Sequence, residues 1–523
     1  MSATAAKTKR STKAAMGPFG QVGKIVDELD DRLGLAKGGR VFLDKIFPDH
    51  WSFMLGEISL YSFIVLLATG IFLSLYFVPS TQQVIYPIHG TYAPLRGQWV
   101  SEAFKSTVDI SFNVRGGLLV RQMHHWGADI FTGSIIVHMA RIFFTGAFRK
   151  PRELNWIIGT TMLILAILEG FIGYSLPDDL ISGTGLRIGY SIAESIPIVG
   201  SYLVSFLWGG QFPGTGIIIP RFFIIHVLII PLVLLGLVSV HLGLLVRQKH
   251  TQFAGEGRTE TNVVGSPMFP TFMAKTTGFL FMVTAATALL GAFVQINPIW
   301  QFGSYNPSKI SYAVQPDWYM GWLDGALRIM PSWEFAGWGH TIPLEVFLPA
   351  VIFPGLIFNI AFIWPALERR LTGDNELHNL LDRPRDRPKR TAAGAAMFAL
   401  LFTLFGASST DVLANFFHIS LNEVLWFFRI AVILIPIVAG LVTYQLCREM
   451  QGVHGIGKRK RPVIVQRSAE GEYTTVPTPT RPDDMHTELD PEPVPVRIDI
   501  EPLSNGGTRE PESSPTGVRQ VTR

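Results

Sequence analysis

Two membrane-length apolar stretches decide the fold: HHWGADIFTGSIIVHMAR at 124–141 and RFFIIHVLIIPLVLLGLVSVHLG at 221–243. The first places His124 and His138 14 residues apart, and the second places His226 and His241 15 residues apart. At about 100° per residue, each pair projects to roughly one face of its helix, at two heights about 21 Å apart. A ligating side chain inside lipid is costly and usually marks a site. The pattern therefore indicates two metal centres stacked across a bilayer.

Two helices that each supply one neutral imidazole at each height form the arrangement that holds a haem iron by both axial positions. The neighbouring histidines do not fit, since His125 lies about 140° from His138 and His250 about 180° from His241. A packing role is the ordinary alternative for a single histidine, but four in register favour haem. Zinc is disfavoured, because the chain has one cysteine, Cys447, and no His/Cys cluster at zinc spacing. That lone cysteine also excludes a disulfide framework, an iron–sulfur cluster and a covalently attached c-type haem.

Glycine pairs on two other apolar segments repeat the vertical period of the histidines. Gly56 and Gly70 lie 14 residues apart, and so do Gly159 and Gly173. A flat macrocycle inside a helical bundle needs helices without side chains at its level, whereas close helix packing is the alternative use of such glycines. The shared period favours the haem interpretation.

Two arginines flank the first histidine pair. Arg121 precedes His124 by three residues, and Arg141 follows His138 by three. Haem propionates are anionic, so a cation just outside each level is the expected counter-ion. Arginines at the ends of membrane helices are also common for topological reasons alone.

The composition is that of a polytopic all-α membrane protein: 523 residues, 48% hydrophobic and only 16% charged. Apolar runs long enough to cross a bilayer predict eight spans. They are 54–78, 124–146, 155–175, 222–246, 276–296, 342–365, 393–412 and 421–446. Residues 19–34 predict a short amphipathic helix on the membrane surface, and no cleavable signal peptide precedes the first span.

Lys and Arg gather in the N-terminal segment, in every second connection and after the last span. This distribution assigns both termini and those connections to the cytoplasmic side. The opposite connections, 79–123, 176–221 and 297–341, are long and poorer in basic clusters. From about residue 455 onward the chain is Pro-rich and polar, and we expect it to be extended or disordered.

The connection after the fifth span contains Pro316, Asp317, Trp318 and Tyr319. A carboxylate in an aromatic, proline-bent and partly buried setting is suited to accept a proton. An interfacial aromatic belt with an ordinary surface aspartate is the alternative interpretation.

With these motifs the chain resembles cytochrome b, the membrane core of the cytochrome bc complex (respiratory complex III), from about residue 40 to 447. The resemblance rests on the histidine and glycine pairs and on GYSLP (173–177), IPIVG (196–200), LWGG (207–210), PRFF (220–223) and PDWY (316–319). Eight spans in one polypeptide are similar to the fused form of the family. The extra tail, and Asp where the family usually has Glu in the last motif, are most similar to actinobacterial members, which implies menaquinone as the quinone.

The resemblance implies four parts of the chain. These are a cytoplasmic N-terminal segment at 1–53, a dihaem four-helix bundle at 54–247, a second transmembrane domain carrying the PDWY loop at 248–447, and a cytoplasmic tail at 448–523. It also implies an outer haem on His124 and His226 and an inner haem on His138 and His241. Arg121 and Arg141 match propionate-binding arginines of the family.

For the external quinol site, the resemblance implies a proton-accepting Asp317 assisted by Tyr319. The lining of that site is implied to include Gly183, Gly185, Ile188, Pro316 and Trp318. Asp317 is one methylene shorter than the usual Glu, Asp324 stands where many relatives have an aromatic residue, and Asp178-Asp179 replace the tryptophan that usually follows GYSLP.

The inner quinone site does not transfer from the family pattern. The usual histidine after the fourth span aligns with Val246, and the usual aspartate at the start of the fifth aligns with Thr276. Lys275 matches the family, and Trp51, Arg247 and His250 are predicted to belong to this site from their cytoplasmic location.

The resemblance further implies a quinol–cytochrome c oxidoreductase in the plasma membrane, with two non-covalent b-type haems and a quinone substrate. A Rieske iron–sulfur protein, a c-type cytochrome, a second copy of the complex, a terminal oxidase and lipids are the implied partners, and nucleic acid is not. Two alternatives stay open: a dihaem subunit that only relays electrons for another dehydrogenase, and a haem-free transporter with polar intramembrane histidines.

Overall fold

The computed structural model describes residues 42–309, 315–337, 339–452, 463–467 and 473–477, together with positions 28, 32 and 39. The predicted surface helix at 19–34 therefore lies almost wholly outside the described residues. The chain divides into two units, 1–454 and 455–523.

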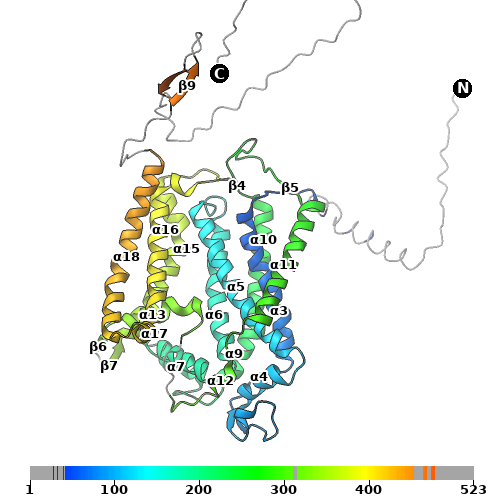
Figure 1. The fold of residues 1–523 in the computed structure, drawn as a ribbon, viewed down its shortest axis with the longest axis vertical. Coiled ribbons are helices and arrows are strands. Elements are labelled where there is room, and N and C mark those ends of the chain that lie inside the picture. Colours follow the sequence, from blue (N-terminus) through cyan, green and yellow to red (C-terminus); the bar gives the residue numbers. More distant parts are fainter. Residues whose placement is uncertain are drawn as a thin grey trace, which may run out of the picture. The chain divides into compact units, whose positions relative to one another are not determined.

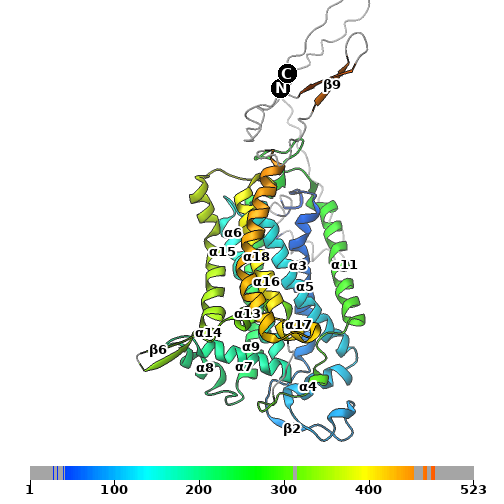
Figure 2. The same ribbon diagram turned by 60° about the vertical axis from the view of Figure 1, so that its left-hand side comes forward.

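Eight helices of the first unit are long and apolar enough to cross a membrane, as the sequence predicts. They run side by side along one direction (Figures 1 and 2). Six of the spans are α3 (Met54–Ser74), α5 (Gly117–Phe144), α6 (Glu153–Ser175), α11 (Met273–Phe293), α16 (Pro388–Ala407) and α18 (Leu421–Met450). The fourth span is built from α9 (Ile218–Ile224), a π-helical turn η3 (Ile225–Ile229) and α10 (Ile230–Gln248). The sixth joins α14 (Leu344–Phe347), a π-helical turn η6 (Leu348–Ile352) and α15 (Phe353–Thr372).

Several helix ends differ from the predicted ones by up to seven residues, and capping residues mark some of the observed ends. Ser420 and Glu423 form a capping box that starts α18. Gly373, in the left-handed conformation, ends α15. The second span begins at Gly117, seven residues before the start at His124 that the sequence predicts. His124 therefore lies about two turns inside the helix.

Shorter elements occupy the connections. The helices are α4 (Glu102–Phe112), α7 (Leu180–Glu194), α8 (Gly200–Trp208), α12 (Ile299–Phe302), α13 (Gly321–Ile329) and α17 (Thr410–Phe417). The short helical turns are η1 (Trp51–Phe53), η2 (Ala93–Leu95), η4 (Met268–Phe272), η5 (Trp318–Met320) and η7 (Pro384–Asp386). The two-stranded pairs are β1 (Ile46–Phe47) with β5 (Ser266–Pro267), β2 (Gln83–Ile85) with β3 (Trp99–Ser101), β4 (Gln252–Phe253) with β8 (Leu380–Leu381), and β6 (Glu334–Gly337) with β7 (His340–Pro343). Figure 1 shows α4, α7, α12, α13 and α17 together at one end of the bundle.

The connections rich in Lys and Arg meet at the opposite end. Strand β1 pairs with β5, and β4 pairs with β8, so the segment before the first span and the fourth and sixth connections lie together. The guanidinium of Arg152 donates to the carbonyl oxygen of His378 at 2.7 Å, which adds the second connection. This end, called the basic end below, is the one that the sequence assigns to the cytoplasm.

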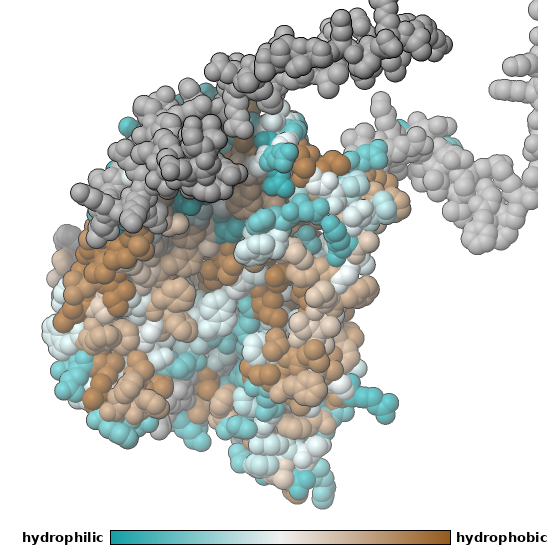
Figure 3. Space-filling model, turned by 45° about the horizontal axis from the view of Figure 1, so that its top comes forward, coloured by the Kyte–Doolittle hydropathy of each residue, from teal (hydrophilic) through white to brown (hydrophobic). Residues whose placement is uncertain are grey.

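Helices α3, α5, α6 and α10 pack against one another in sequence, and η3 closes the ring against α3. Their shared core includes Phe63, Phe131, Ile172 and Leu234, all buried. Large apolar side chains on the outer faces of the spans are exposed, including Phe281 on α11 and Leu441 on α18. Hydrophobic residues, coloured brown in Figure 3, cover much of the visible side surface of the helical bundle, as expected of helices that face lipid.

The described residues of the second unit form one hairpin. Residues 463–467 (β9) and 473–477 (β10) pair antiparallel within the segment that the sequence predicts to be an extended or disordered tail, and for the rest of this segment that stays a prediction. The alternation VIVQR and YTTVP is rich in β-branched residues, which favour strands. The proline content of the flanking sequence obscured this short pattern.

Candidate functional site

His124 on α5 and His226 in η3 face each other across the bundle. Their ring centroids lie 6.1 Å apart with the planes at 76°. Two imidazoles that each approach one metal ion to about 2 Å have ring centres roughly 6 Å apart. The pair is therefore spaced to clamp one iron between two ring nitrogens.

Hydrogen bonds determine which nitrogen of each outer histidine points to the centre of the bundle. Thr69 Oγ1 donates to the carbonyl oxygen of Val65 at 2.7 Å, so it accepts from His124 Nδ1, 2.9 Å away. His226 Nδ1 lies 3.2 Å from the carbonyl oxygen of Glu169 and 3.0 Å from its Oε1. Both Nε2 atoms are thus left for a ligand.

The inner histidines differ in this respect. His138 Nδ1 is buried and has no hydrogen-bond partner within the described residues, whereas the His241 ring interacts with the backbone of Asn155. Both levels therefore offer imidazole ligands, but their Nδ1 atoms are hydrogen-bonded to different extents.

Each predicted glycine lies against one of the four histidines. A Cβ on Gly70 would lie 3.2 Å from the His124 ring, and one on Gly173 would overlap the His226 ring. At the inner level, a Cβ on Gly56 would lie 3.1 Å from His138, and one on Gly159 would lie 4.0 Å from His241. The glycines keep the facing surfaces of two helices, α3 and α6, flat at both histidine levels, as a planar macrocycle requires.

The spacing of 15 in the fourth span is explained by the π-helical turn. A π turn closes i→i+5 bonds and so inserts one extra residue into an α-helix. His226 lies inside this turn at Ile225–Ile229. The insertion brings His226 and His241 back towards the 14-residue register of the other helices, and such insertions are frequent at functional sites.

Both predicted arginines have buried guanidinium N–H groups without hydrogen-bond partners among the described residues. Arg121 donates from Nη1 to the carbonyl oxygen of Asn297 at 3.2 Å, but its Nε and Nη2 have no partner among the described residues. Arg141 likewise has unpartnered Nε and Nη2 atoms and lies 4.3 Å over the ring of Phe53. Unpartnered buried guanidinium groups fit anionic carboxylates such as propionates.

No three His, Cys, Asp or Glu side chains converge as a metal-ion site in the described part of the chain. A pair of imidazoles alone is too small a ligand set for a bare transition metal. Each pair therefore fits a group that brings its own equatorial ligands.

The PDWY turn packs against α5 and α6. Tyr319 Oη donates to Asp317 Oδ2 at 3.0 Å, and His125 Nε2 lies 3.2 Å from Asp317 Oδ1. Trp318 Nε1 donates to Asp129 Oδ1 at 3.0 Å. Burial and the adjacent Asp317 carboxylate raise the pKa of Tyr319 well above its usual value. Tyr319 thus stays a proton donor that orients the carboxylate.

Three residues near these sites were not predicted: His125, Asp129 and Glu169. His125 was set aside because it faces away from the histidine pairs, and that is the face on which Asp317 lies. The two carboxylates carried a signal, since an acidic residue inside a membrane span is rare and usually functional. Asp324, in contrast, forms an ion pair with Arg328 at 2.7 Å.

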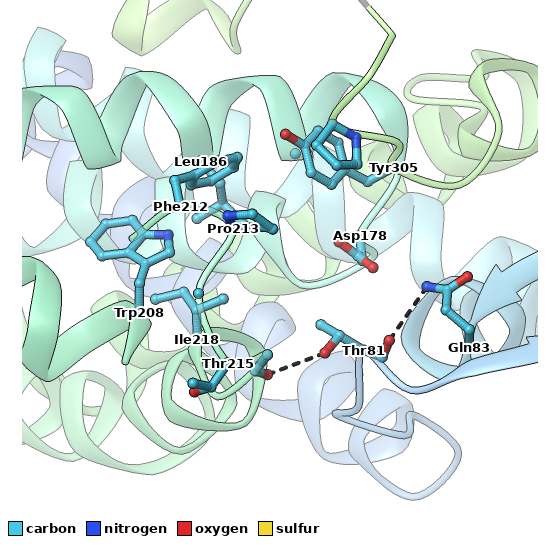
Figure 4. A pocket seen from close by; sticks show the side chains of 14 residues that line it. Thr81, Gln83, Asp178, Leu186, Trp208, Phe212, Pro213, Thr215, Ile218 and Tyr305 are labelled. Carbon is cyan, nitrogen blue, oxygen red and sulfur yellow. Dashed lines mark hydrogen bonds between the residues drawn. The ribbon is translucent and has the colours of Figure 1, made fainter. Parts of the chain in front are cut away.

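The predicted residues on α7 are not joined to the PDWY turn by any hydrogen bond among the described residues. Gly183 lies against Tyr305 and lines a cavity of about 310 Å³. The rings of Trp208, Phe212 and Tyr305 border this cavity together with the Asp178 carboxylate (Figure 4).

The remaining α7 residues point elsewhere. A Cβ on Gly185 would meet open space, and Ile188 is 42% exposed. Of the Asp178-Asp179 pair, Asp179 has a clear structural role. Asp179 caps α7 in a capping box with Ser182, worth about 1 kcal/mol. Burial raises the pKa of Asp178 to about 7.

At the basic end, three of the four residues predicted for the inner quinone site gather around residues 46–53. Lys275 Nζ lies 2.9 Å from Asp49 Oδ1, and the His250 ring packs on Phe47 with centroids 4.3 Å apart. Trp51, in η1, is 71% exposed. Burial, with nearby Lys45 and Arg152, lowers the pKa of His250 to about 4, so its imidazole is neutral. Arg247 is exposed at the end of α10 and has no contact that places it with the others.

The chain matches the cytochrome b(N-terminal)/b6/petB family over residues 129–304. It is 47% identical over 493 residues to the cytochrome bc1 complex cytochrome b subunit of Streptomyces coelicolor, covering 93% of this chain and 88% of that protein. The subunit of the same name from Mycobacterium leprae is 49% identical over 467 residues, which cover 88% of this chain and 83% of the relative. A structure of a hyperthermophilic respiratory Complex III superposes with a TM-score of 0.57 at 21% identity, over 80% of this chain and 99% of that chain, a likeness of fold alone.

Proposed function

This chain belongs to the cytochrome b subunits of cytochrome bc1 complexes, and from that premise we propose that it oxidises quinol near one membrane face and sends one electron through two b-type haems to a quinone near the other. The chain is a multi-pass membrane protein with eight spans. The observation that carries the proposal is the clamp of His124 and His226, 6.1 Å apart, together with the flat glycine faces at both histidine levels.

Four histidines hold the haems in this proposal: His124 and His226 at the outer level, His138 and His241 at the inner level. A haem iron with two imidazole ligands supplies a reversible one-electron carrier. The chain's own part is to orient the imidazoles through their Nδ1 atoms and to exclude water. Arg121 and Arg141 neutralise propionates with their unpartnered N–H groups.

Asp317 is the proposed proton acceptor for quinol. Tyr319 fixes one of its carboxylate oxygens and His125 lies against the other, so the second lone pairs remain for a quinol hydroxyl. A subunit that only relays electrons has no use for this cluster, which favours quinol chemistry over the relay alternative. The similarity to actinobacterial subunits supports menaquinol as the substrate.

The proposal includes the surroundings of the chain. The basic end faces the cytoplasm and the chain lies in the cell membrane, with both termini inside. A Rieske iron–sulfur protein accepts the other electron, and a c-type cytochrome takes it onward, as expected of a quinol–cytochrome c reductase. A paired copy of the complex and association with a terminal oxidase complete the proposed assembly.

The direct test is a reduced-minus-oxidised absorption spectrum of the complex purified through a tag on this chain. We expect two b-type components and, on acid extraction, about two haem b per chain. A folded complex without a b-type band would remove the proposal.

Gly173 provides a sharper test of the haem geometry. Gly173→Ala is expected to displace the His226 ring, because the added methyl overlaps it, and to remove most of the outer b-type component while the inner one remains. The matched control is Gly236→Ala in α10, where a Cβ meets nothing within 4 Å. Resolved spectra of both variants check this, and equal outer components in the two would contradict it.

A further inference from the structure

Glu57, Tyr61 and Thr276 form a hydrogen-bonded cluster between α3 and α11. Thr276 Oγ1 donates to Glu57 Oε2 at 2.8 Å, and Tyr61 Oη donates to the same oxygen at 3.2 Å. The two hydroxyl groups also contact each other. Tyr61 is buried, whereas Glu57 and Thr276 are half-buried. The cluster thus holds one carboxylate between two helices, near the basic end of the spans.

Glu57 has no ion-pair partner within the described residues. The nearest basic side chain on α11, Lys275, pairs with Asp49 at 2.9 Å instead. The Glu57 carboxylate is held by two hydroxyl donors and not by a cation of the described residues. Its second oxygen makes no hydrogen bond to the cluster and is left for another group.

The cluster lies beside the inner histidine level. Gly56 is the residue that approaches the His138 ring, since a Cβ added there would lie 3.1 Å from it, and Glu57 follows Gly56 directly. One residue along a helix turns the side chain by about 100°. The carboxylate therefore points away from the histidine and towards α11, at nearly the same height.

We propose that Glu57, positioned by Tyr61 and Thr276, is the proton donor to quinone at the inner site. This inference rests on the proposed function. In the contact between the two helices, α3 supplies the carboxylate of Glu57 and α11 supplies the hydroxyl group of Thr276.

The chemistry balances with one carboxyl group. Conversion of a quinone to a quinol takes two electrons and two protons. The electrons arrive singly from the inner haem level. For each electron, Glu57 releases its proton to a quinone oxygen, becomes a carboxylate, and regains a proton from cytoplasmic water. Phe279, whose ring centroid lies 6.0 Å from that of Tyr61, adds an apolar face beside the cluster for the quinone ring.

The test uses the purified complex with the outer quinol pocket blocked by an inhibitor of that pocket. A tail-less naphthoquinol then reduces the inner haem only from the basic end, in the reverse of the proposed step. Glu57→Gln is expected to slow this reduction by about a hundredfold, the contribution of a positioned acid–base group. Tyr61→Phe keeps the carboxylate and is expected to slow it by about fivefold, the worth of one hydrogen bond.

A carboxylate swap separates a chemical role from a structural one. The double variant Glu57→Gln with Thr276→Asp returns a carboxylate to the cluster from α11, and we expect it to recover most of the rate. Glu256→Gln, an exposed carboxylate in the fourth connection, is the matched control and should equal the wild type.

Failure of this inference and failure of the proposed function give different results. If the wild type reduces its inner haem by this route and Glu57→Gln does so at the same rate, Glu57 is not the donor and the proposed function stands. If the wild-type complex shows no b-type reduction by either route, the proposed function itself fails.

Discussion

The substitution His124→Leu is expected to abolish binding of the outer haem and to leave the inner haem in place. His124 supplies one of two imidazoles that face each other at 6.1 Å, and leucine fills a similar volume without a nitrogen ligand. The inner level depends on His138, nearly four turns further along α5, so it keeps both of its ligands. Low-temperature difference spectra of the purified complex, which separate the two b-type components, measure the outcome.

The adjacent histidine is the matched control for this substitution. His125→Leu removes a side chain of the same type from the same helix, but this side chain contacts Asp317 and not the facing histidine. We expect both b-type components to persist in it. Equal loss of both components in folded His124→Leu complex would count against the assignment of two separate levels.

The substitution Asp317→Asn is expected to slow quinol oxidation by about a hundredfold while both haems stay bound. The amide oxygen still accepts the Tyr319 hydroxyl, so the turn keeps its shape, but the side chain no longer takes a proton at neutral pH. Steady-state reduction of cytochrome c by naphthoquinol measures the rate, and the b-type spectrum reports the haems.

A carboxylate on the same membrane face but outside the cluster controls for a general loss of charge. Asp109 in α4 pairs with Lys105 at 2.6 Å and is remote in sequence from the PDWY turn. Asp109→Asn is expected to retain wild-type turnover. Unchanged turnover in Asp317→Asn would discard the proton-accepting role of Asp317.

The sequence was sufficient for the spans, because these depend on the length and hydropathy of single segments. The assignment of the histidine and glycine levels to two haems stays a prediction. Each glycine could be matched to a histidine level from its 14-residue spacing, and the structure places each glycine at one histidine ring. The offset left by the spacing of 15 was not explained from the sequence. It required the π-helical turn around His226, whose hydrogen bonds leave no signature in hydropathy.

Contacts between distant segments could not be predicted in the same way. Asp317 meets His125 across 192 positions, and Glu57 meets Thr276 across 219. Nothing in the local pattern of either partner identifies the other, because these pairs arise from the packing of whole helices. The grouping of Gly183, Gly185 and Ile188 with the PDWY turn stays a prediction.

The histidines of the two proposed haem levels differ in the hydrogen bonds made by their Nδ1 atoms. An acceptor on Nδ1 makes an imidazole richer in electron density at its other nitrogen and so stabilises the oxidised state of the metal there. His124 and His226 both have such acceptors, from Thr69 and Glu169, whereas His138 has none within the described residues. With haems bound as proposed, the outer imidazoles would favour the oxidised iron more than His138 would at the inner level, and this difference would favour electron transfer towards the basic end.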